Sequence, residues 1–588
     1  MVAASRLGGL IWRRLGFSQS EKLTIYIMSS LAACISGLQM VPFLLNTMVA
    51  GRYYASDENG WDRLSDLLPR WFAPTDARVI RDYYEGSGSL YRVETLAEWA
   101  GPLAFWSAMM ALMVIGAVCL SNVFGSQWIN RERLTFPLAQ LPLRMTEEGP
   151  HATFWRNRLM WGGFALAGLL ESVNFVNYLF PSVPTVWLKA RRWDAWAMAR
   201  PWNAVRPLSL AFYPFMIGIG FLLTQEVAFS CWFFYLLGKL ECIITAAAGF
   251  RGGAAGSGLA RLPLVHEQGT GAMLGLIAGA VWVARRQLRE AWRQNRIDST
   301  GFLTPRAALL GLAVSVLALT TMASVAGVPA IIALVLFVLY FVVMMAISRV
   351  VAEAGAGWTM LGSAQSPHGL IIAALGTRGW NPRSLASFAF MDWMDSDYRD
   401  AVPVQLLTGL KFQTEAGVPR RQMLWSVVVA TGVGLVSSLW VHLHIYYTYG
   451  AATAKVRSWY TSVGTIAYRK LAGWTNYPTD RDWWGLGGYA AGALTVMGLG
   501  FARQQMPTLA LHPVGYAIAN TPSMDYLWMP FLIAWALKAV ILRYSGIKTY
   551  RMLVPFALGG VLGDFAIPAL WGLYGTLISK QMYLFFPH

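Results

Sequence analysis

Apolar runs separated by short polar stretches account for most of the chain. Several of these runs are long enough to cross the roughly 30 Å hydrocarbon layer of a bilayer as helices, which takes about 20 residues. The pattern predicts such helices at residues 23–49, 101–123, 160–180, 271–283, 307–325, 328–348, 424–446, 486–501, 527–543 and 552–578. The expected fold class is therefore an all-α, polytopic bundle of membrane helices, with about 12–16 spans when broken or re-entrant segments are counted.

Two stretches interrupt this regular pattern. Residues 207–224 and 227–250 are apolar segments joined by a polar Gln-Glu pair, and they form either a re-entrant pair or two full spans. The apolar helix that ends near residue 348 continues into SRVVAEAGAG, and its glycines and the later Pro367 predict a broken helix inside the membrane. The region 349–411 is therefore expected to be the centre of the molecule.

The distribution of charge divides the chain into two halves. Residues 1–22 carry basic side chains ahead of an apolar run with no cleavage site, which predicts a cytoplasmic N-terminus and an uncleaved first span. A second basic stretch, rich in arginine, predicts a cytoplasmic linker between the halves. The predicted domains are the N-terminus 1–22, a first half 23–284 with an external loop 50–98, the linker 285–306, and a second half 307–588 with the central region 349–411 and an external loop 447–484.

The two halves follow a similar order of segments. From Leu23, and again from Leu424, a span is followed by an aromatic loop, a span rich in small residues, and a polar stretch with a proline. That stretch reads LTFPLAQ in the first half and ALHPVGYA in the second. Because internal duplication is common in secondary transporters, this order predicts an internal repeat.

Composition supports a membrane location and excludes several classes of protein. Of the 588 residues, 56% are hydrophobic and 13% charged, and the mean hydropathy is +0.44. The formal net charge of +17 is expected from basic cytoplasmic loops and gives no reason to expect nucleic-acid binding. The four cysteines lie in predicted spans without a CxxC pair, so neither disulfides nor structural zinc are expected. Walker A, GxSxG and HExxH sequences do not occur, so we expect no catalytic residues, no metal and no cofactor.

Ionisable side chains inside predicted spans are the candidate functional residues, because they are costly in lipid and mark solute or ion pathways. Arg349 and Glu353 are four residues apart, on one helix face and within reach of an ion pair. Proton coupling needs an acid beside a cation in a low-dielectric cavity, which this pair provides. The other transport or coupling candidates are Glu226, Lys538 and Asp564, and the candidates for a gate or entrance are Asp392, Asp395 and Asp397. For each of these, the alternative is an ion pair without a transport role.

A polar stripe lies in the predicted span 160–180. Glu171, Asn174 and Asn177 follow one another at intervals of three, so they lie near one face of a helix. Polar groups in lipid need a partner or a cavity. The stripe is therefore either a seam of hydrogen bonds between helices or a polar lining of the solute path.

Four passages resemble the oligopeptide transporter family in its broad sense, which includes the metal-chelate transporters of plants. They are RERLTFPLAQL at 131–141, SRVVAEAGAG at 348–357, DWMDSDYRDAVPVQ at 392–405 and GGVLGDF at 559–565. The Asn-Pro-Gly and Lys-Ile-Pro-Pro-Arg signatures of the peptide-transporting branch are absent, and Glu353 stands where the family usually has glycine. The resemblance implies a proton-coupled secondary transporter of a small polar solute, peptide-like or chelate-like. It implies no particular solute.

Two other functions are weighed against transport. A membrane-embedded enzyme, such as a lipid-linked sugar transferase, would use carboxylates and aromatic rings of the first external loop, where Asp57-Glu58 and Asp82-Tyr83-Tyr84-Glu85 occur. A structural or accessory subunit would pair off all its intramembrane polar groups. The expected partners are the solute, protons and the lipid bilayer, without nucleic acid, and self-association is left open. The expected location is the bacterial cytoplasmic (inner) membrane.

Overall fold

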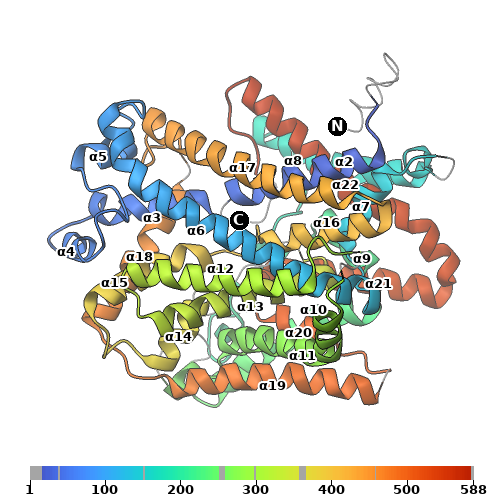
Figure 1. Cartoon of the computed structure of the whole chain (residues 1–588). Helices are drawn as coiled ribbons and strands as arrows, with labels where there is room; N and C mark the ends of the chain where they lie inside the picture. Colours follow the sequence, from blue (N-terminus) through green and yellow to red (C-terminus); the bar gives the residue numbers. More distant parts are fainter. Residues whose placement is uncertain are drawn as a thin grey trace.

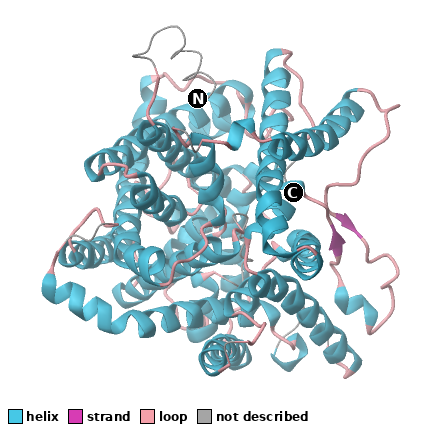
Figure 2. Ribbon diagram, turned by 90° about the vertical axis from the view of Figure 1, so that its right-hand side faces the viewer, coloured by secondary structure: helices cyan, strands magenta, loops and turns pink. Residues whose placement is uncertain are grey.

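Helices make up nearly all of the structure (Figure 1). The computed structural model describes residues 16–37, 40–149, 152–250, 258–296, 300–356, 366–456, 458–506 and 508–584. Within these ranges the only strands are β1 (Arg191–Arg192) and β2 (Ser209–Leu210), an antiparallel pair in the loop seen at the right of Figure 2. The predicted all-α fold class is confirmed.

The described ranges contain 10 helical segments that are long and apolar enough to cross a membrane. These segments have the length and composition of the spans of an integral membrane protein. The longer helices are α2 (Gln19–Ser36), α3 (Val41–Tyr53), α6 (Val93–Ser126), α8 (Arg158–Leu179), α10 (Gln225–Ala247), α11 (Val265–Gln294), α12 (Pro305–Val325), α13 (Ala330–Ala354), α16 (Val402–Ala416), α17 (Arg420–Tyr449), α18 (Ser458–Asn476), α19 (Trp483–Gln505), α21 (Met524–Tyr544) and α22 (Gly546–Leu577).

Short helices fill the turns and the interruptions between the long ones. The short α-helices are α4 (Trp61–Asp66), α5 (Ala77–Glu85), α7 (Pro137–Thr146), α9 (Pro214–Leu222), α14 (Pro367–Leu375), α15 (Pro382–Phe390) and α20 (Pro513–Ala519). Five of these seven begin with proline, which has no N–H to leave unpaired at the start of a helix. Single helical turns lie at η2 (Gln127–Arg131), η3 (Phe154–Arg156), η4 (Trp202–Val205), η5 (Gly258–Arg261) and η7 (Met391–Asp395).

The two ends of the bundle differ in content. We call the end of the bundle where α2 begins the N-terminal end. There Ser18 and Glu21 form a capping box, and Lys22 forms an ion pair with Glu148 at 2.7 Å. At the opposite end, here the far end, Figure 1 shows α4, α5, α15 and α18 gathered together. The predicted loop 50–98 therefore folds largely into short helices and the start of α6.

The predicted span 23–49 lies within one membrane-length segment, Gln19–Tyr53, but two helices share this segment, since α2 ends at Ser36 and α3 begins at Val41. Two other sequence predictions about helix boundaries are wrong. The linker 285–306 begins inside α11, whose charged last turns extend to Gln294. The loop 447–484 contains α18, which packs on α3 and buries Val463, Ala467 and Leu471. In these two cases the helix is polar or amphipathic, so a pattern of long apolar runs does not reveal it.

The segments 207–224 and 227–250 form a helical hairpin that returns to one loop. The start of α9 is tied to this loop, where Phe212 N donates to Leu188 O at 2.8 Å. The later part of α10 contacts it as well, because Lys239 Nζ donates to Pro207 O at 2.7 Å and Arg200 donates to Phe250 O at 3.1 Å. α9 has 9 residues and is too short to cross a bilayer, whereas α10 has 23 residues and is of membrane length, so the choice between a re-entrant pair and two spans stays a prediction.

Glycines allow two helix pairs to approach until their backbones touch. In the pair α8 and α22, a Cβ added at Gly163 would overlap the carbonyl oxygen of Phe556. In the pair α11 and α19, a Cβ at Gly271 would overlap the carbonyl oxygen of Tyr489. Small residues at such contacts are the usual way that membrane helices pack closely.

Gly271→Ala is expected to destabilise the protein by about 1–3 kcal/mol, because the added methyl group meets backbone that can only move by separating α11 from α19. The thermal midpoint in detergent, followed by tryptophan fluorescence, measures the change. Gly279→Ala in the same helix is the control, since nothing lies within 4 Å of its added Cβ. Equal midpoints for the two variants would contradict the close contact.

Two of the proline-led helices meet the end of α13. Just before α7, Phe136 N donates to Ala352 O at 2.9 Å. At the start of α20, Pro513 lines the same groove as Arg349. These are the segments LTFPLAQ and ALHPVGYA, which occupy corresponding places in the two halves of the sequence. The internal repeat itself stays a prediction, but its two proline segments flank one helix end.

Candidate functional site

The end of α13 is built as a sharp stop. Gly355 has φ +62°, a left-handed conformation that ends a helix and favours glycine. A Cβ there would also meet Pro137 and Ile219. Thr135 Oγ1 donates to the carbonyl oxygens of Ala352 at 3.3 Å and Glu353 at 3.1 Å, so the last carbonyls of the helix are satisfied. The helix ends where the sequence predicts a break, and the position of this break inside the membrane stays a prediction.

Arg349 lies between two carboxylates, and Arg349, Glu132 and Glu353 are here called the Arg349 cluster. Its Nη2 donates to Glu132 Oε2 at 2.6 Å and to Glu353 Oε1 at 3.3 Å, so the predicted ion pair is present. Its guanidinium also lies over the ring of Trp128, 5.4 Å from the ring centre. The Arg349 side chain is only 13% exposed, and Nε and Nη1 have no hydrogen-bond partner in the described part of the chain.

Glu226 lies near this cluster, on a second ion pair. Arg503 of α19 donates to Glu226 Oε2 at 2.7 Å and to the carbonyl oxygen of Leu509 at 3.0 Å. Arg503 is within electrostatic reach of Glu353, and Arg349 is within reach of His512 before α20. The structure therefore brings three of the five predicted coupling residues into one neighbourhood.

A groove of about 450 Å³ leads to the Arg349 cluster. Arg349 and Glu132 line it, and α11 and α19 form its walls through residues such as Gly279 and Gly500. Most of the wall is apolar, with the two charged side chains among a few polar groups. A mostly apolar cleft with few polar groups is the usual form of a small-molecule site.

Lys538 and Asp564 do not join the Arg349 cluster, because they hold the two ends of α9. Asp564 Oδ2 accepts a hydrogen bond from Phe215 N at 2.7 Å at the start of the helix. Lys538 Nζ donates to the carbonyl oxygens of Leu223 and Phe221 at its end. An anion at the first turn and a cation at the last complement the helix dipole. These two residues stabilise a broken helix, which differs from the predicted direct coupling role.

The polar stripe of α8 divides into two parts. Glu171 lies beside Asp564, so two carboxyl groups share a buried site at the start of α9. Asn174 Oδ1 accepts from Val186 N at 2.8 Å, and Asn177 Nδ2 donates to Val183 O. The two asparagines anchor the loop after their own helix, which is neither the seam between helices nor the solute lining that the sequence left open.

The three aspartates of the predicted gate are buried, and each has a cationic partner. Asp392 accepts from Lys470 Nζ of α18 at 2.6 Å. Asp395 Oδ2 lies 2.6 Å from His368 Nδ1, at the start of α14. Asp397 accepts from Arg399 Nε at 2.7 Å. They form no open entrance in this conformation. They lock together α14, η7 and α18.

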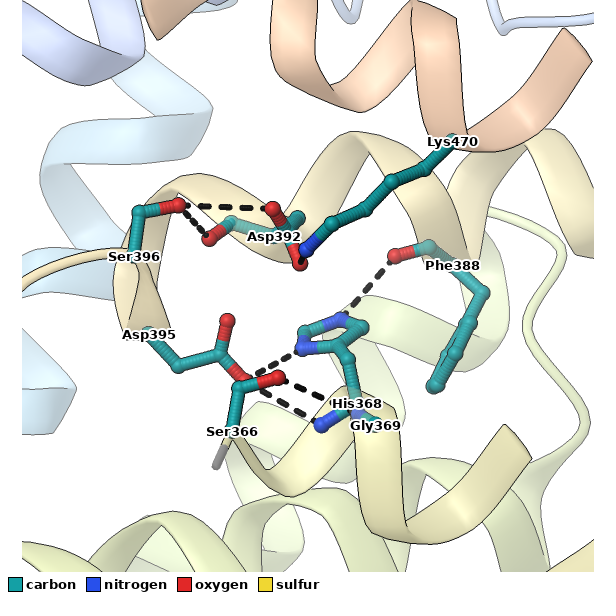
Figure 3. Close-up of polar contacts among 8 residues, drawn as sticks. All are labelled: Ser366, His368, Gly369, Phe388, Asp392, Asp395, Ser396 and Lys470. Atoms are coloured by element: carbon teal, nitrogen blue, oxygen red, sulfur yellow. Dashed lines mark hydrogen bonds and ion pairs between the residues drawn. The ribbon is translucent and has the colours of Figure 1, made fainter. Parts of the chain in front are cut away.

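His368, Asp392, Asp395 and Lys470 form one group, the His368 cluster, shown in Figure 3. In Figure 3 the His368 ring lies between Asp395 and the carbonyl oxygen of Phe388, while Lys470 reaches across to Asp392. His368 and Lys470 were not predicted from the sequence. The available signal was a histidine directly after a helix-starting proline in the apolar sequence PHGLIIAAL.

Burial by itself lowers the pKa of His368, but the adjacent Asp395 carboxylate and then Asp392 outweigh burial and raise the pKa above its ordinary value. The ligand atoms of His368, Asp392 and Asp395 lie within 4.8 Å of one another, so by distance they could reach one metal ion. Their donor set fits a metal poorly. Lys470 already neutralises Asp392, and the ring nitrogen of His368 faces Asp395 directly.

The loop expected to hold enzyme carboxylates has a different structure. Asp82 accepts from Arg92 at 3.3 Å and from Ser87 at 3.0 Å. Tyr83 and Tyr84 are 0% exposed, so their rings pack in the core and present no face on which a sugar could stack. The acids and aromatics at 82–85 therefore do not line an open groove.

Comparison with known proteins gives a family but no function. The model of a family described as a family of unknown function, DUF6785, matches residues 1–587. No curated protein matches the chain.

Proposed function

The chain belongs to the DUF6785 family, whose function is unknown, and we propose from its geometry that it is a secondary transporter of a small polar solute. The observation that supports this most is a buried arginine with unpartnered N–H groups in the described part of the chain, at the inner end of a groove and beside interrupted helices. Secondary transporters build their sites from such interruptions, because unwound backbone is tolerated in a membrane only where it lines protein or a cavity.

A carboxylate is the solute group that fits Arg349 best. The guanidinium presents several donors in a planar fork that matches the two oxygens of a carboxylate. Among the described residues only Nη2 of Arg349 has acceptors, so Nε and Nη1 keep donors for the carboxylate of a solute, which would be the third at this guanidinium after Glu132 and Glu353. Peptides and organic metal chelates both carry carboxylates, and both are within the solute class proposed.

Glu353 is the acid proposed to couple solute to protons. It shares Arg349 with Glu132, and its Oε2 has no hydrogen-bond partner in the described chain. A proton on Glu353 removes one of the two negative charges that compete for Arg349. With less competition for the positive charge, the Nε and Nη1 donors of Arg349 bind the solute carboxylate more tightly, which couples proton binding to solute binding.

The orientation proposed places the N-terminal end in the bacterial cytoplasm. Basic residues lie at helix ends and in the short connections at this end, namely Arg131, Arg133, Arg144, Arg156, Arg420 and Arg421. Basic residues in short connections collect on the cytoplasmic side of the membrane. The groove beside Arg349 would then serve the cytoplasmic half of the transport path.

Glu353→Gln is expected to reduce proton-driven uptake at least about tenfold while solute exchange without a gradient continues, because the amide cannot carry the proton. The measurement uses proteoliposomes with a panel of radiolabelled dipeptides and ferric carboxylate chelates, with and without an inward proton gradient. Glu415→Gln is the matched control, since Glu415 pairs with Lys411 on a helix surface and is 45% exposed.

Equal gradient-driven uptake by Glu353→Gln and the parent would remove Glu353 from the coupling role. Absence of uptake and of exchange by the parent protein, for every solute of the panel, would contradict transport of these solutes altogether.

A further inference from the structure

The His368 cluster is a second group of buried charges that the proposed solute site does not use. It combines His368 of α14, Asp392 and Asp395 of η7, and Lys470 of α18. The side chains of His368 and Asp395 are each 1% exposed. Its position is defined by the hydrogen bonds drawn in Figure 3.

Both ring nitrogens of His368 face hydrogen-bond acceptors. Nε2 lies 3.0 Å from the carbonyl oxygen of Phe388, and a carbonyl oxygen can only accept, so Nε2 carries a hydrogen. Nδ1 lies 2.6 Å from Asp395 Oδ2, and that oxygen also accepts the His368 backbone N–H at 3.2 Å. Without a proton between them, Nδ1 and Oδ2 would bring two lone pairs into contact. The geometry therefore requires one proton shared by His368 and Asp395.

Charge balance leads to the same conclusion. Asp392 and Asp395 contribute two negative charges, while Lys470 contributes one positive charge. The shared proton makes the cluster neutral, and its loss leaves one uncompensated negative charge in a buried site, which is costly. In the described part of the chain, the other titratable groups that face the cluster are the phenols of Tyr340 on α13 and Tyr398 after η7, and both are neutral.

The cluster is buried but has one contact with the exterior. Lys470 is 21% exposed, while its Nζ bonds Asp392 at 2.6 Å. Asp395 Oδ1 is buried and has no hydrogen-bond partner in the described chain, and Figure 3 shows it directed toward the space beside Asp392 and Ser396. Asp395 Oδ1 is therefore an acceptor without a described donor, and it lies on the side of Asp392, the residue that bonds Lys470.

We infer that His368 and Asp395 form a proton-binding site, separate from Glu353, and that its proton holds α14, η7 and α18 together as a closed gate. The gate role rests on the proposed transport function, whereas proton binding does not. The ligand is a single proton shared between Nδ1 and Oδ2. Its release leaves a net negative charge that weakens the contacts among these three elements.

A proton-binding site at His368 and Asp395 predicts how the stability of the protein depends on pH. Because the folded state holds the proton more tightly than unfolded histidine does, the stabilisation is present below the ordinary histidine pKa of about 6.5 and is lost as pH rises through the folded-state pKa. The thermal midpoint of the full-length protein in detergent, followed by tryptophan fluorescence, should fall by about 5 °C or more between about pH 6.5 and about pH 9.5.

Asp395→Asn is the decisive variant, because asparagine has nearly the same shape as aspartate and can bond His368 without a shared proton. The amide introduced at position 395 can donate to Nδ1 of a neutral His368, and the remaining charges of Asp392 and Lys470 cancel. Its thermal midpoint should therefore stay nearly constant over the same pH range. Asp194→Asn is the control, since Asp194 is equally buried but lies elsewhere and accepts from Leu208 N. This control should keep the pH dependence of the parent.

A second variant guards against failure of the first to fold. In His368→Gln no ring nitrogen shares the proton, so Asp395 either stays charged or binds a proton alone at lower pH. The midpoint of this variant should lie below that of the parent and change little between about pH 6.5 and about pH 9.5. A pH dependence over this range in Asp395→Asn or His368→Gln as steep as that of the parent would overturn the proton site. A rise of the parent midpoint on adding Zn²⁺ or Na⁺ at fixed pH, absent in Asp395→Asn, would overturn it in favour of a metal-ion site.

The role of the His368 cluster as a gate is tested in proteoliposomes with the same panel of dipeptides and chelates. Asp395→Asn should accumulate solute at least about tenfold less under a proton gradient than the parent. A loss of pH-dependent stability together with unchanged accumulation would keep the proton site and overturn its role as a gate. If the parent transports nothing, the proposed function and the gate fail together, while the midpoint measurements still decide proton binding.

Discussion

Replacing Arg349 by methionine is expected to destabilise the protein by about 3–5 kcal/mol and to abolish uptake. The change leaves the carboxylates of Glu132 and Glu353 buried without their cation, although methionine preserves most of the side-chain volume. The same change removes the donors proposed to bind the solute. The thermal midpoint in detergent and uptake by proteoliposomes measure the two effects separately.

The double variant Arg349→Met with Glu353→Gln distinguishes charge from packing. It removes one of the two uncompensated charges, so it should regain part of the lost stability but no uptake. Arg286→Met, at an exposed position of α11, is the control and should change stability by less than about 0.5 kcal/mol. A loss below about 1 kcal/mol for Arg349→Met would mean that water already compensates the two acids.

Lys538→Met is expected to cost about 2–4 kcal/mol, because the carbonyl oxygens of Phe221 and Leu223 lose their donor where α9 ends. Lys538 is 7% exposed, so water cannot easily replace the ammonium group. The hairpin of α9 and α10 should loosen. Hydrogen–deuterium exchange should rise over 214–230, and the thermal midpoint should fall.

The matched control for this change is Lys548→Met, an exposed lysine early in α22. It should leave both the midpoint and the exchange of 214–230 unchanged. Faster exchange throughout the protein after Lys538→Met, without preference for this hairpin, would contradict a local capping role.

The long helices could be predicted from sequence because apolar runs of membrane length have few alternatives. The spans at 307–325 and 328–348 correspond closely to α12 and α13. The interruption between α2 and α3 is hard to predict, because the runs on both sides are apolar and the short signal of Ser36, Gly37 and Pro42 is weak. The helix α18 was missed for the opposite reason, since its exposed face is polar and resembles a loop.

The candidate site could be predicted only where its parts are close in the sequence. A spacing of four residues was enough to pair Arg349 with Glu353. Glu132 reaches the same guanidinium from the segment between α6 and α7, 217 positions away, and no spacing rule reveals such a contact. In the same way, Lys538 and Asp564 were identified as unusual residues, but their task at the two ends of α9 depends on tertiary structure.

The pairing of α11 with α19 has a mechanical consequence. Gly271 and Gly275 touch the backbone of α19, whereas nothing lies within 4 Å of a Cβ at Gly279, one turn further along. The two helices are thus in close contact at one end of their pairing, and space opens beside Gly279 in the groove that Arg349 lines. Under the proposed function, a movement of α11 away from α19 near Trp282 and Phe501 would widen the route to the guanidinium while the glycine contacts stay closed. The glycine contacts would then be the hinge of this movement.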